Sequence, residues 1–458
     1  MSIVELHITK VVGGGRGLAH HQDEIWMVSG ALPGERVRAE GLTSRKGIIE
    51  GKTIEILSAP HPARESAPCP HSPLCGGCDW PYILPEAGTA LKAEVASEAA
   101  RGWPELSRLL SKAPVTASPM AYRLRAQLHW DPDQGILGFY RHRSNTVEAI
   151  EECRILSPRL VRSLPSLTRA FARSCPHPVD IEWLENLDGS QAVAALKRVE
   201  RGPDVPVSAV PAADTLDDGP NGFHILKSSG DLERVWGRDH VRMALPLSLE
   251  VPIGTFFQGN RHLVPWLFQR VADLVGPVPV PTWDLHAGVG FLAAAATHAA
   301  ERPLVLAEIS KSSGRAARRN LPKATIRFGV PAEEILRRSG RIPKESLVIV
   351  DPPRAGLSSD LRRRLAAWHP DRILMLACDP ATWARDTAEL ISKGYRLTHL
   401  ELIDLFPSTH HVEVLSVLEA EGSVSSTGEA RIQGSGIRDQ GAGNTEQGTG
   451  TGTSVALP

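Results

Sequence analysis

The sequence predicts an α/β protein whose C-terminal part is a doubly wound domain. Two short apolar runs, residues 347–350 and 373–376, each end in polar side chains, as buried parallel strands do at the edge of a sheet. Residues 251–418 alternate such runs with helical patterns, which is typical of a doubly wound domain. The first 60 residues instead alternate short strand-like runs with turns. We therefore expect a small β-barrel, a mixed central region and an α/β domain, in that order.

Composition sets wide limits on what this chain does. Its 458 residues are enough for about three domains. The net charge of -1 shows that the chain as a whole is not strongly basic. A local basic surface is nevertheless enough to bind nucleic acid. The clusters Arg315–Arg319 and Arg362–Arg364 are interpreted as solvated helix faces. No apolar run reaches the length of a membrane span, and the start lacks the pattern of a secretory signal. We expect a cytoplasmic protein without a membrane contact, and no protein partner is evident.

The N-terminal 60 residues predict a barrel of the oligonucleotide-binding style. Strand-like runs occupy residues 3–8, 25–28, 36–39 and 51–57. Strong turn signals separate them at Gly13–Gly17 and Leu32–Glu35. Short strands at this spacing favour a small closed sheet. Such a fold alone does not establish a function.

Residues 61–250 begin with a group of cysteines and continue as a mixed domain. Without a secretory signal, a disulfide framework is disfavoured and metal ligation gains weight. Spacing alone leaves zinc and an iron–sulfur cluster open, because both accept four thiolates. Further on, residues 123–130 and 135–140 predict a hairpin with one polar face, and the proline-rich residues 200–220 a connector. The predicted ligands are Cys69, Cys75, Cys78 and, from a distant segment, Cys153; Cys175 is interpreted as a packing residue.

The α/β domain opens with a predicted nucleotide-type cofactor site. The turn Gly288-Val289-Gly290 follows the strand that ends at Asp284, and glycine lets the backbone approach a ligand closely. A glycine turn alone could serve a dinucleotide, S-adenosylmethionine or no ligand. A second strand, residues 304–307, ends in Glu308, whose carboxylate can accept hydrogen bonds from both ribose hydroxyls. Together with Asp284, this acid favours S-adenosylmethionine.

Two later strands end in reactive side chains. Residues 347–350 lead into Asp351, and residues 373–376 lead through Ala377 into Cys378. A helical pattern follows from Ala381. The N-terminus of a helix can stabilise the thiolate form of a cysteine that directly precedes it. A lone cysteine after a strand is usually a packing residue, but the neighbouring acidic strand end favours chemistry at Cys378.

The segments Cys378-Asp379-Pro380 and Asp351-Pro352-Pro353-Arg354 together resemble the RNA 5-methyluridine methyltransferases. In that family a Cys-Asn-Pro segment holds the nucleophile and an Asp-Pro-Pro-Arg segment contacts the target base. The resemblance covers the chain from residue 1 to about residue 418, with Asp379 in place of the usual Asn. It implies that Cys378 is the nucleophile, that Glu413 is the general base, and that Asp351 lies between uracil and cofactor.

The resemblance also implies a Rossmann-like S-adenosylmethionine methyltransferase domain at residues 251–419. It implies a [4Fe–4S] cluster on the four cysteines, with zinc second, and an RNA-binding TRAM domain at residues 1–60. Within Phe256–Asn260, Gln258 would contact the methionine part of the cofactor. The chain departs from the family at several cofactor positions. His286 stands where an aromatic residue is usual, Ala287 replaces Cys, Phe291 replaces Asn, and Pro331 replaces Asp or Asn.

The resulting hypothesis is methylation of carbon 5 of a uridine in RNA through a covalent cysteine adduct. The barrel and the cysteine loop favour 23S ribosomal RNA, because the bacterial transfer-RNA branch generally lacks both. Transfer RNA, another methyl acceptor, and an RNA-binding iron–sulfur protein with a degenerate cofactor pocket are the alternatives. Residues 420–458 contain few large apolar side chains and are predicted to form a disordered tail.

Overall fold

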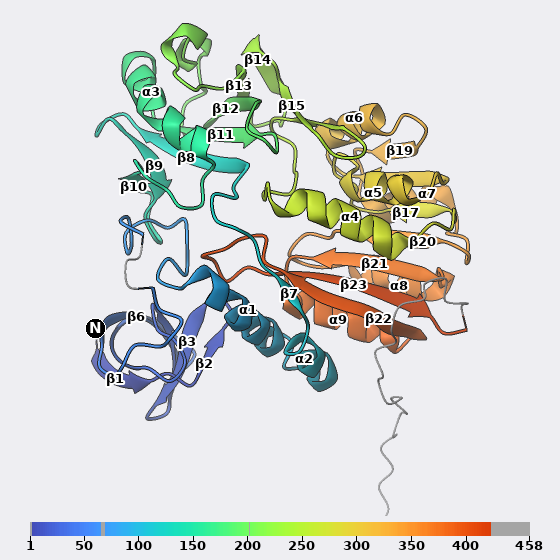
Figure 1. The fold of residues 1–458 in the computed structure, drawn as a ribbon, viewed down its shortest axis with the longest axis horizontal. Helices are drawn as coiled ribbons and strands as arrows, with labels where there is room; N and C mark the ends of the chain where they lie inside the picture. The colour runs from blue at the N-terminus through green and yellow to red at the C-terminus, as the bar shows by residue number, and fades with distance from the viewer. Residues whose placement is uncertain (1, 66–68, 201, 423–458) are drawn as a thin grey trace, which may run out of the picture. The chain divides into compact units, whose positions relative to one another are not determined.

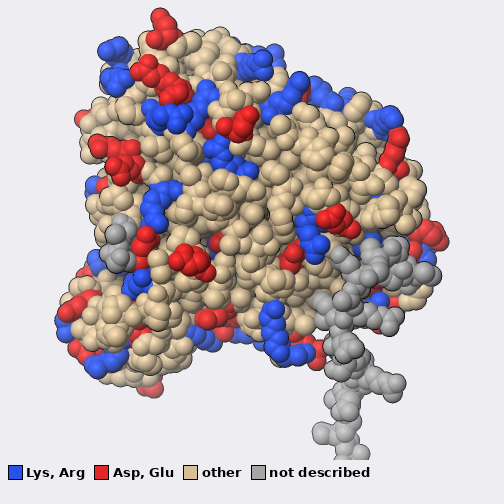
Figure 2. Space-filling model, viewed as in Figure 1, with Lys and Arg blue, Asp and Glu red and all other residues tan. Residues whose placement is uncertain are grey.

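The computed structural model describes residues 2–65, 69–200 and 202–422, and their strands form four sheets (Figure 1). No helix in these three ranges is long and apolar enough to cross a membrane. The predicted disordered tail lies outside the described residues from residue 423 on. On the face drawn in Figure 2, blue Lys and Arg side chains alternate with red Asp and Glu, as the net charge of -1 leads one to expect.

The N-terminal region is a six-stranded curled sheet, which confirms the predicted barrel architecture. Trp26 is fully buried at its centre, and Gly41 and Gly51 leave room for the indole ring. The strand order is β1-β5-β6-β4-β3-β2. The strands are β1 (Ile3–His7), β2 (Lys10–Val12), β3 (Arg16–His21), β4 (Glu24–Ser29), β5 (Arg36–Arg45) and β6 (Ile48–Ile56).

Two helices and a short strand follow the cysteine loop. Helices α1 (Pro85–Ala99) and α2 (Pro104–Leu110) both start with proline, whose fixed φ suits the first helical position. Strand β7 (Val115–Thr116) pairs in parallel with β22 (Tyr395–Ile403) at the edge of the C-terminal sheet. Residues 85–116 therefore pack with the C-terminal domain, although the chain enters the central sheet directly after them.

The central region is a seven-stranded sheet backed by helix α3 (Pro158–Ser174). The helix begins where the Ser157 hydroxyl accepts a hydrogen bond from the Leu160 amide, a standard N-cap. Its apolar side packs on the sheet, and the predicted hairpin is present as β8 and β9. In sheet order the strands are β10 (Val147–Ala149), β9 (Ile136–Tyr140), β8 (Arg125–Asp131), β11 (Val179–Glu185), β12 (Ala192–Arg198), β13 (Gly222–Leu226) and β14 (Leu232–Gly237).

The remaining small elements link the central region to the C-terminal domain. Two single-turn 3₁₀ helices, η1 (Val207–Ala209) and η2 (Ala213–Thr215), lie in the predicted connector. Strands β15 (His240–Met243) and β16 (Leu249–Pro252) form a separate two-stranded sheet. Their inward side chains join the same core as helix α4 (Leu263–Val275).

The C-terminal domain confirms the predicted doubly wound fold. Its sheet has the order β19-β18-β17-β20-β21-β23-β22-β7, and the five strands from β19 to β21 are parallel. Side chains alternate between two cores, so Ile349 packs with α4 and α5, whereas Val348 packs with α8 and α9. Helices thus cover both faces. The further elements are β17 (Thr282–Asp284), α5 (Phe291–Ala299), β18 (Leu304–Glu308), α6 (Lys311–Asn320), β19 (Thr325–Phe328), α7 (Ala332–Ser339), β20 (Leu347–Val350), α8 (Ser359–Trp368), β21 (Arg372–Ala377), α9 (Pro380–Ile391) and β23 (Glu413–Ala420).

The two arginine clusters lie on helices, as predicted. Arg362 on α8 pairs with Asp386 and Glu389, and Arg363 and Arg364 pair with Asp360. On α6, the Arg318 guanidinium stacks over the Phe328 ring at 4.9 Å.

Candidate active site

The predicted site residues gather at the carboxyl edge of the C-terminal sheet. Neighbouring parallel strands bring Asp284, at the end of β17, beside Glu308, at the end of β18. Asp351 follows β20 and Cys378 follows β21, on the other side of β17. Ligands bind at this edge in open α/β sheets because the strand order reverses there.

Glu413 reaches the same edge from an antiparallel strand. Ala377 of β21 pairs with Val414 of β23, so the next position in this register places Glu413 beside Cys378. Glu413 is 6 % exposed and Cys378 is half-buried. The charge of Glu413 raises the pKa of both Asp351 and Cys378, and the charge of Asp351 also raises the pKa of Cys378. The structure therefore brings together the three residues to which the sequence assigned the chemistry.

Burial changes the protonation of all three groups. Removal from water raises the pKa of Glu413 to about 7, and it raises the pKa of Asp351 well above its ordinary range, helped by the Glu413 charge. Burial, followed by the charges of Glu413 and Asp351, raises the pKa of Cys378 to about 11. These influences oppose the predicted stabilisation of the thiolate by a helix N-terminus, which stays a prediction. The amino end of α9 is capped by the Asp379 carboxylate.

Two cations counter these carboxylates. Arg354 lowers the pKa of both Cys378 and Glu413, and Lys92 lowers that of Glu413. Lys92 is 1 % exposed on α1 and is hydrogen-bonded to Asp404. Arg354 is the last residue of the Asp351-Pro352-Pro353-Arg354 motif, so the sequence already indicated that it lies near the site. Nothing in the sequence around Lys92 indicates a buried side chain, because a lone Lys in a helical pattern is normally solvated.

A pocket opens beside Asp351 at the same edge. Gln258 is buried there, and its Nε2 donates a hydrogen bond to Asp351 Oδ2 at 3.2 Å. His286 Nδ1 is buried without a hydrogen-bond partner, and burial lowers the pKa of this imidazole to about 4. The ring is therefore neutral at physiological pH. The lining residues are Phe256, Phe257, Gln258, His286, Ala287, Gly288, Val289, Phe291, Leu292 and Asp351.

The glycine turn is tied to the acid of the second strand. Gly288 and Gly290 have φ of 55° and 91°, a region that side chains with a Cβ disfavour. The Gly288 amide donates to Glu308 Oε2 at 2.7 Å, and the Ser310 amide donates to Glu308 Oε1 at 2.6 Å. A carboxylate has about four lone-pair sites, so Glu308 keeps acceptor capacity for ribose hydroxyls.

Asp284 is a buried carboxyl of this edge with little hydrogen bonding. It is 1 % exposed, and its oxygens have no hydrogen-bond partner of good geometry, although the backbone of His286 and Ala293 lowers its pKa in part. Burial and the neighbouring Asp351 and Glu308 charges raise the pKa of Asp284 to about 8. A cationic ligand bound nearby would satisfy this carboxylate.

Three of the four departures from the family pattern, His286, Ala287 and Phe291, line the same pocket. Phe291 begins α5, and its ring packs on Phe257 and Phe268 at centroid distances of 5.4 and 6.0 Å. It replaces a polar side chain with a core contact. Pro331 does not line this pocket; it is exposed, precedes α7 and offers no side-chain cap or amide hydrogen.

The four predicted cysteine ligands lie in one region. Each of the four thiols is half-buried. Burial, together with the charges of Cys153, Cys75 and Cys69, raises the pKa of Cys78 to about 12. The loop that carries Cys75 is fixed to β9, because the Gly76 amide donates to the Tyr140 carbonyl at 2.9 Å. The described residues contain one group of His, Cys, Asp or Glu whose ligand atoms all lie within 4.8 Å, and it is Asp79, His410 and His411. The thiols are therefore adjacent without forming so tight a group.

Comparisons with known proteins agree with this geometry. Residues 343–421, which carry Asp351, Cys378 and Glu413, match the model of the tRNA (uracil-5-)-methyltransferase family. The chain is 33% identical over 447 residues to an uncharacterized RNA methyltransferase of Streptomyces avermitilis, covering 91% of this chain and 98% of the relative. It is 32% identical to a 23S rRNA (uracil(1939)-C(5))-methyltransferase RlmD of Alkalilimnicola ehrlichii, covering 91% and 96%. The chain belongs to the RNA (uracil-C5)-methyltransferase family.

The fold of this RNA (uracil-C5)-methyltransferase also has a solved counterpart. The tRNA (uracil-54, C5)-methyltransferase of Pyrococcus abyssi, solved with S-adenosyl-L-homocysteine, superposes with a TM-score of 0.71 at 21% identity. The superposition covers 90% of this chain and 99% of that one. This superposition shows the shared fold, and the relatives named above confirm the predicted family and enzyme class.

Proposed function

We propose that the enzyme methylates carbon 5 of a uridine in 23S ribosomal RNA, with S-adenosylmethionine as methyl donor. The observation that carries the proposal is the meeting of Cys378, Asp351 and Glu413 beside one pocket. Relatives that share nearly the whole chain are named for 23S rRNA, which favours ribosomal over transfer RNA.

Covalent catalysis divides a difficult methylation into easier steps. Carbon 5 of uracil is a weak nucleophile until the Cys378 thiolate bonds to carbon 6, which opens the double bond and leaves an enolate. Carbon 5 then takes the methyl group and retains one proton. Removal of that proton by Glu413 restores the double bond and expels the thiolate. The bond between the cysteine and carbon 6 is broken again, and the enzyme is regenerated once Glu413 has released the proton to solvent.

The protonation states fit these roles. Arg354 favours the Cys378 thiolate against the pull of burial. Burial and the Glu413 charge raise the pKa of Asp351 and so favour its protonated form, which offers uracil a hydrogen-bond donor as well as an acceptor. Glu413, with a pKa of about 7, is partly ionised at neutral pH, and the ideal catalytic pKa lies near the working pH.

The pocket fits S-adenosylmethionine in charge. When bound, this cofactor supplies a methyl group activated by a positive sulfonium. Burial disfavours the ionised forms of Asp284 and Asp351, and a sulfonium bound beside them would favour those forms. We assign the ribose hydroxyls to Glu308 and the methionine part to Gln258 and Asp351. His286 and the turn Gly288-Val289-Gly290 line the remaining wall.

The N-terminal regions serve RNA binding in this proposal. Residues 1–60 form a TRAM-type barrel, residues 61–250 a central domain and residues 251–419 the methyltransferase domain. A uracil stacked in RNA cannot reach a pocket at a sheet edge, so the target base is unstacked or flipped out.

Cys69, Cys75, Cys78 and Cys153 are assigned to a [4Fe–4S] cluster. Four thiolates satisfy either a zinc ion or an iron–sulfur cluster, and the resemblance to the family favours the cluster.

Two variants test the chemistry. Cys378→Ala should bind RNA and cofactor but form no covalent adduct and no product. Glu413→Gln should attack and methylate, then stall as a methylated protein–RNA adduct that survives a denaturing gel. Cys175→Ala is the matched control, because Cys175 is a buried packing cysteine whose loss should leave turnover intact.

Specific results would overturn these assignments. Methylation by Cys378→Ala would exclude the covalent mechanism. Normal turnover by Glu413→Gln would mean that another residue is the base. Methylation mapped to transfer RNA, and not to 23S rRNA, by comparison with a deletion strain would correct the substrate and leave the chemistry standing.

A further inference from the structure

The segment that delivers the proposed base to the active site is residues 404–412. It connects the end of β22 at Ile403 to Glu413, the first residue of β23. Much of this segment is anchored by side chains or backbone groups that lie far away in the sequence. Lys92 donates hydrogen bonds to Asp404 and to the carbonyl of Phe406 (2.9 Å). Asn260 donates to the carbonyl of Leu405 (2.8 Å), and Tyr122 donates to the carbonyl of Pro407 (3.2 Å). The Trp80 amide donates to the carbonyl of Ser408 (2.9 Å).

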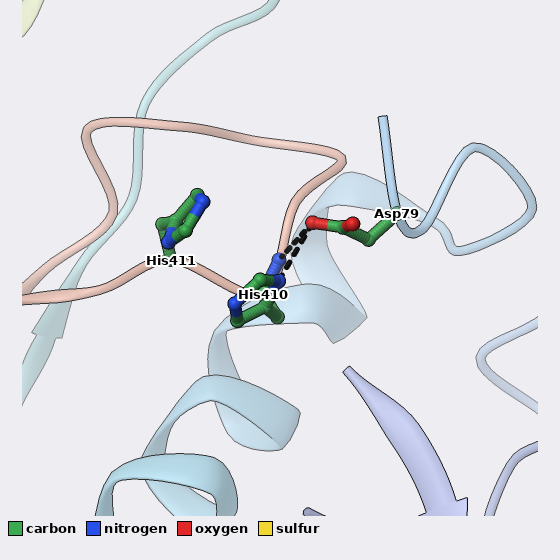
Figure 3. Close-up of side chains that lie close together, drawn as sticks. All are labelled: Asp79, His410 and His411. Atoms are coloured by element: carbon green, nitrogen blue, oxygen red, sulfur yellow. Dashed lines mark hydrogen bonds and ion pairs between the residues drawn. The ribbon is translucent and has the colours of Figure 1, made fainter. Parts of the chain in front are cut away.

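The last part of the segment is held by the cysteine loop. Asp79 directly follows Cys78, and its Oδ2 accepts a hydrogen bond from His410 Nδ1 at 2.6 Å (Figure 3). The same oxygen lies 3.5 Å from the His410 backbone nitrogen. With Trp80 on Ser408, two successive residues of the cysteine loop therefore hold the segment a few residues before Glu413.

The barrel is packed into the same junction. Trp80 is 1 % exposed, and its Nε1 donates to the Gly15 carbonyl at 2.8 Å. A Cβ on Gly15 would lie 2.6 Å from Trp80 Nε1 and 2.9 Å from the Cβ of His410. Because Gly15 has no side chain, the barrel, the cysteine loop and residues 404–412 can pack directly against one another here.

Asp79, His410 and His411 could also be taken as a metal site, because their ligand atoms lie within 4.8 Å of one another. The surrounding charge argues against that interpretation. The Arg354 guanidinium lies 3.2 Å from His411 Nε2, where it would repel a bound cation. His410 Nδ1 is already engaged by Asp79 (Figure 3). The contact is therefore interpreted as a hydrogen-bonded tie.

We propose that Asp79 and His410 are positioning residues that fix Glu413 for proton removal from carbon 5. The proposal rests on the assignment of Glu413 as the base. Residues 404–408 keep their other anchors without Asp79. Residues 409–412 would keep the core packing of Val412, and their main long-range polar contact would be the one between Arg354 and the His411 ring. A small shift of Glu413 changes the step it catalyses, whereas Cys378, which follows β21, keeps its place.

Single-turnover kinetics with Asp79→Ala and His410→Ala test the proposal. Formation of the methylated adduct should stay within about twofold of wild type, whereas its breakdown should slow by about tenfold to a hundredfold, since small misplacements cost up to that much. The methylated adduct should therefore accumulate on a denaturing gel. Asp79→Asn keeps an oxygen acceptor for His410. Its rate of adduct breakdown should therefore lie between the rates of Asp79→Ala and wild type.

The control is a similar contact far from the base. Asp180 Oδ1 lies 2.7 Å from His129 Nδ1 in the central sheet, so Asp180→Ala removes a comparable pair without touching residues 404–412. It should not change the breakdown of the adduct. His410→Ala leaves the cysteine loop unaltered, and its metal content and visible spectrum should match wild type, which separates positioning from loss of a cluster.

The outcomes distinguish this proposal from the one on which it rests. If Glu413→Gln accumulates no adduct, the base assignment fails. If Glu413→Gln accumulates adduct while Asp79→Ala and His410→Ala resolve it as fast as wild type, the positioning role alone is wrong. An equal slowing of adduct formation and breakdown would show a general structural role and would likewise overturn it.

Discussion

Asp284→Asn is the sharpest test of the electrostatics of the proposed cofactor pocket. The Asp284 carboxyl is 1 % exposed and has no hydrogen-bond partner of good geometry, and the backbone of His286 and Ala293 lowers its pKa only in part. Burial raises its pKa from 3.8 to about 8. Asn has nearly the same shape and no charge, so it should remove the dependence of folding on this ionisation.

The sign and size follow from the raised pKa. Between pH 3.8 and about 8 the native protein holds a proton that the unfolded chain has released, so the contribution of Asp284 to stability is complete below pH 3.8 and is lost as the pH rises to about 8. Each pKa unit corresponds to about 1.4 kcal/mol, so wild type should lose up to about 4 kcal/mol relative to the variant between pH 5 and pH 8. Relaxation around the ionised carboxylate would make the loss smaller.

Urea unfolding of both proteins at pH 5, 6, 7 and 8 measures this difference directly. The free energy of unfolding of Asp284→Asn minus that of wild type should rise steadily with pH. S-adenosylmethionine should stabilise wild type more than the variant at pH 8, because a cation nearby relieves the buried negative charge. Parallel curves for the two proteins across this range would show that the carboxylate is paired or hydrated, and the charge argument for the pocket would fail.

Three further outcomes are expected. Glu308→Ala should weaken S-adenosylmethionine binding by about 1.5–3 kcal/mol, the usual range for hydrogen bonds to a charged group, and unchanged affinity in calorimetry would mean that Glu308 does not hold the ribose. Arg354→Ala should slow formation of the Cys378 adduct more than Arg354→Lys does, because the thiolate loses a neighbouring cation; equal rates would contradict this. Protein purified without oxygen should contain iron and sulfide and lose both in Cys153→Ser, and stoichiometric zinc without iron would refute the cluster.

The sequence predicted the site residues that lie at the ends of recognisable strands. Asp284, Glu308, Asp351 and Cys378 each end or follow an apolar run, and parallel strands carry such ends to one edge whatever the loops between them do. The strand that bears Glu413 is antiparallel, so its pairing with β21 could not be read from the same rule. Its role came from family resemblance, and its place beside Cys378 from the structure.

The protonation of Cys378 shows why local patterns were not enough. The sequence places the thiol before a helix, which by itself favours the thiolate. The opposing influences are burial and the charges of Glu413 and Asp351, and these depend on three strands that meet only in the folded sheet. The same limit applies to β7, a two-residue strand whose partner β22 lies far along the chain, beyond the whole central region.

The properties of Glu413 depend on residues distant in the sequence. Burial raises its pKa to about 7, and Lys92 and Arg354 keep the pKa from rising further. Lys92 can act there because α1 packs beside the segment 404–412, where Asp404 and the Phe406 carbonyl hold the ammonium group. A helix that follows the cysteine loop thus helps to set the pKa of the proposed base, while Asp79 and Trp80 hold the segment that leads to it. In the proposed mechanism, the region between the barrel and the central sheet therefore supports the active site and is more than a link between two domains.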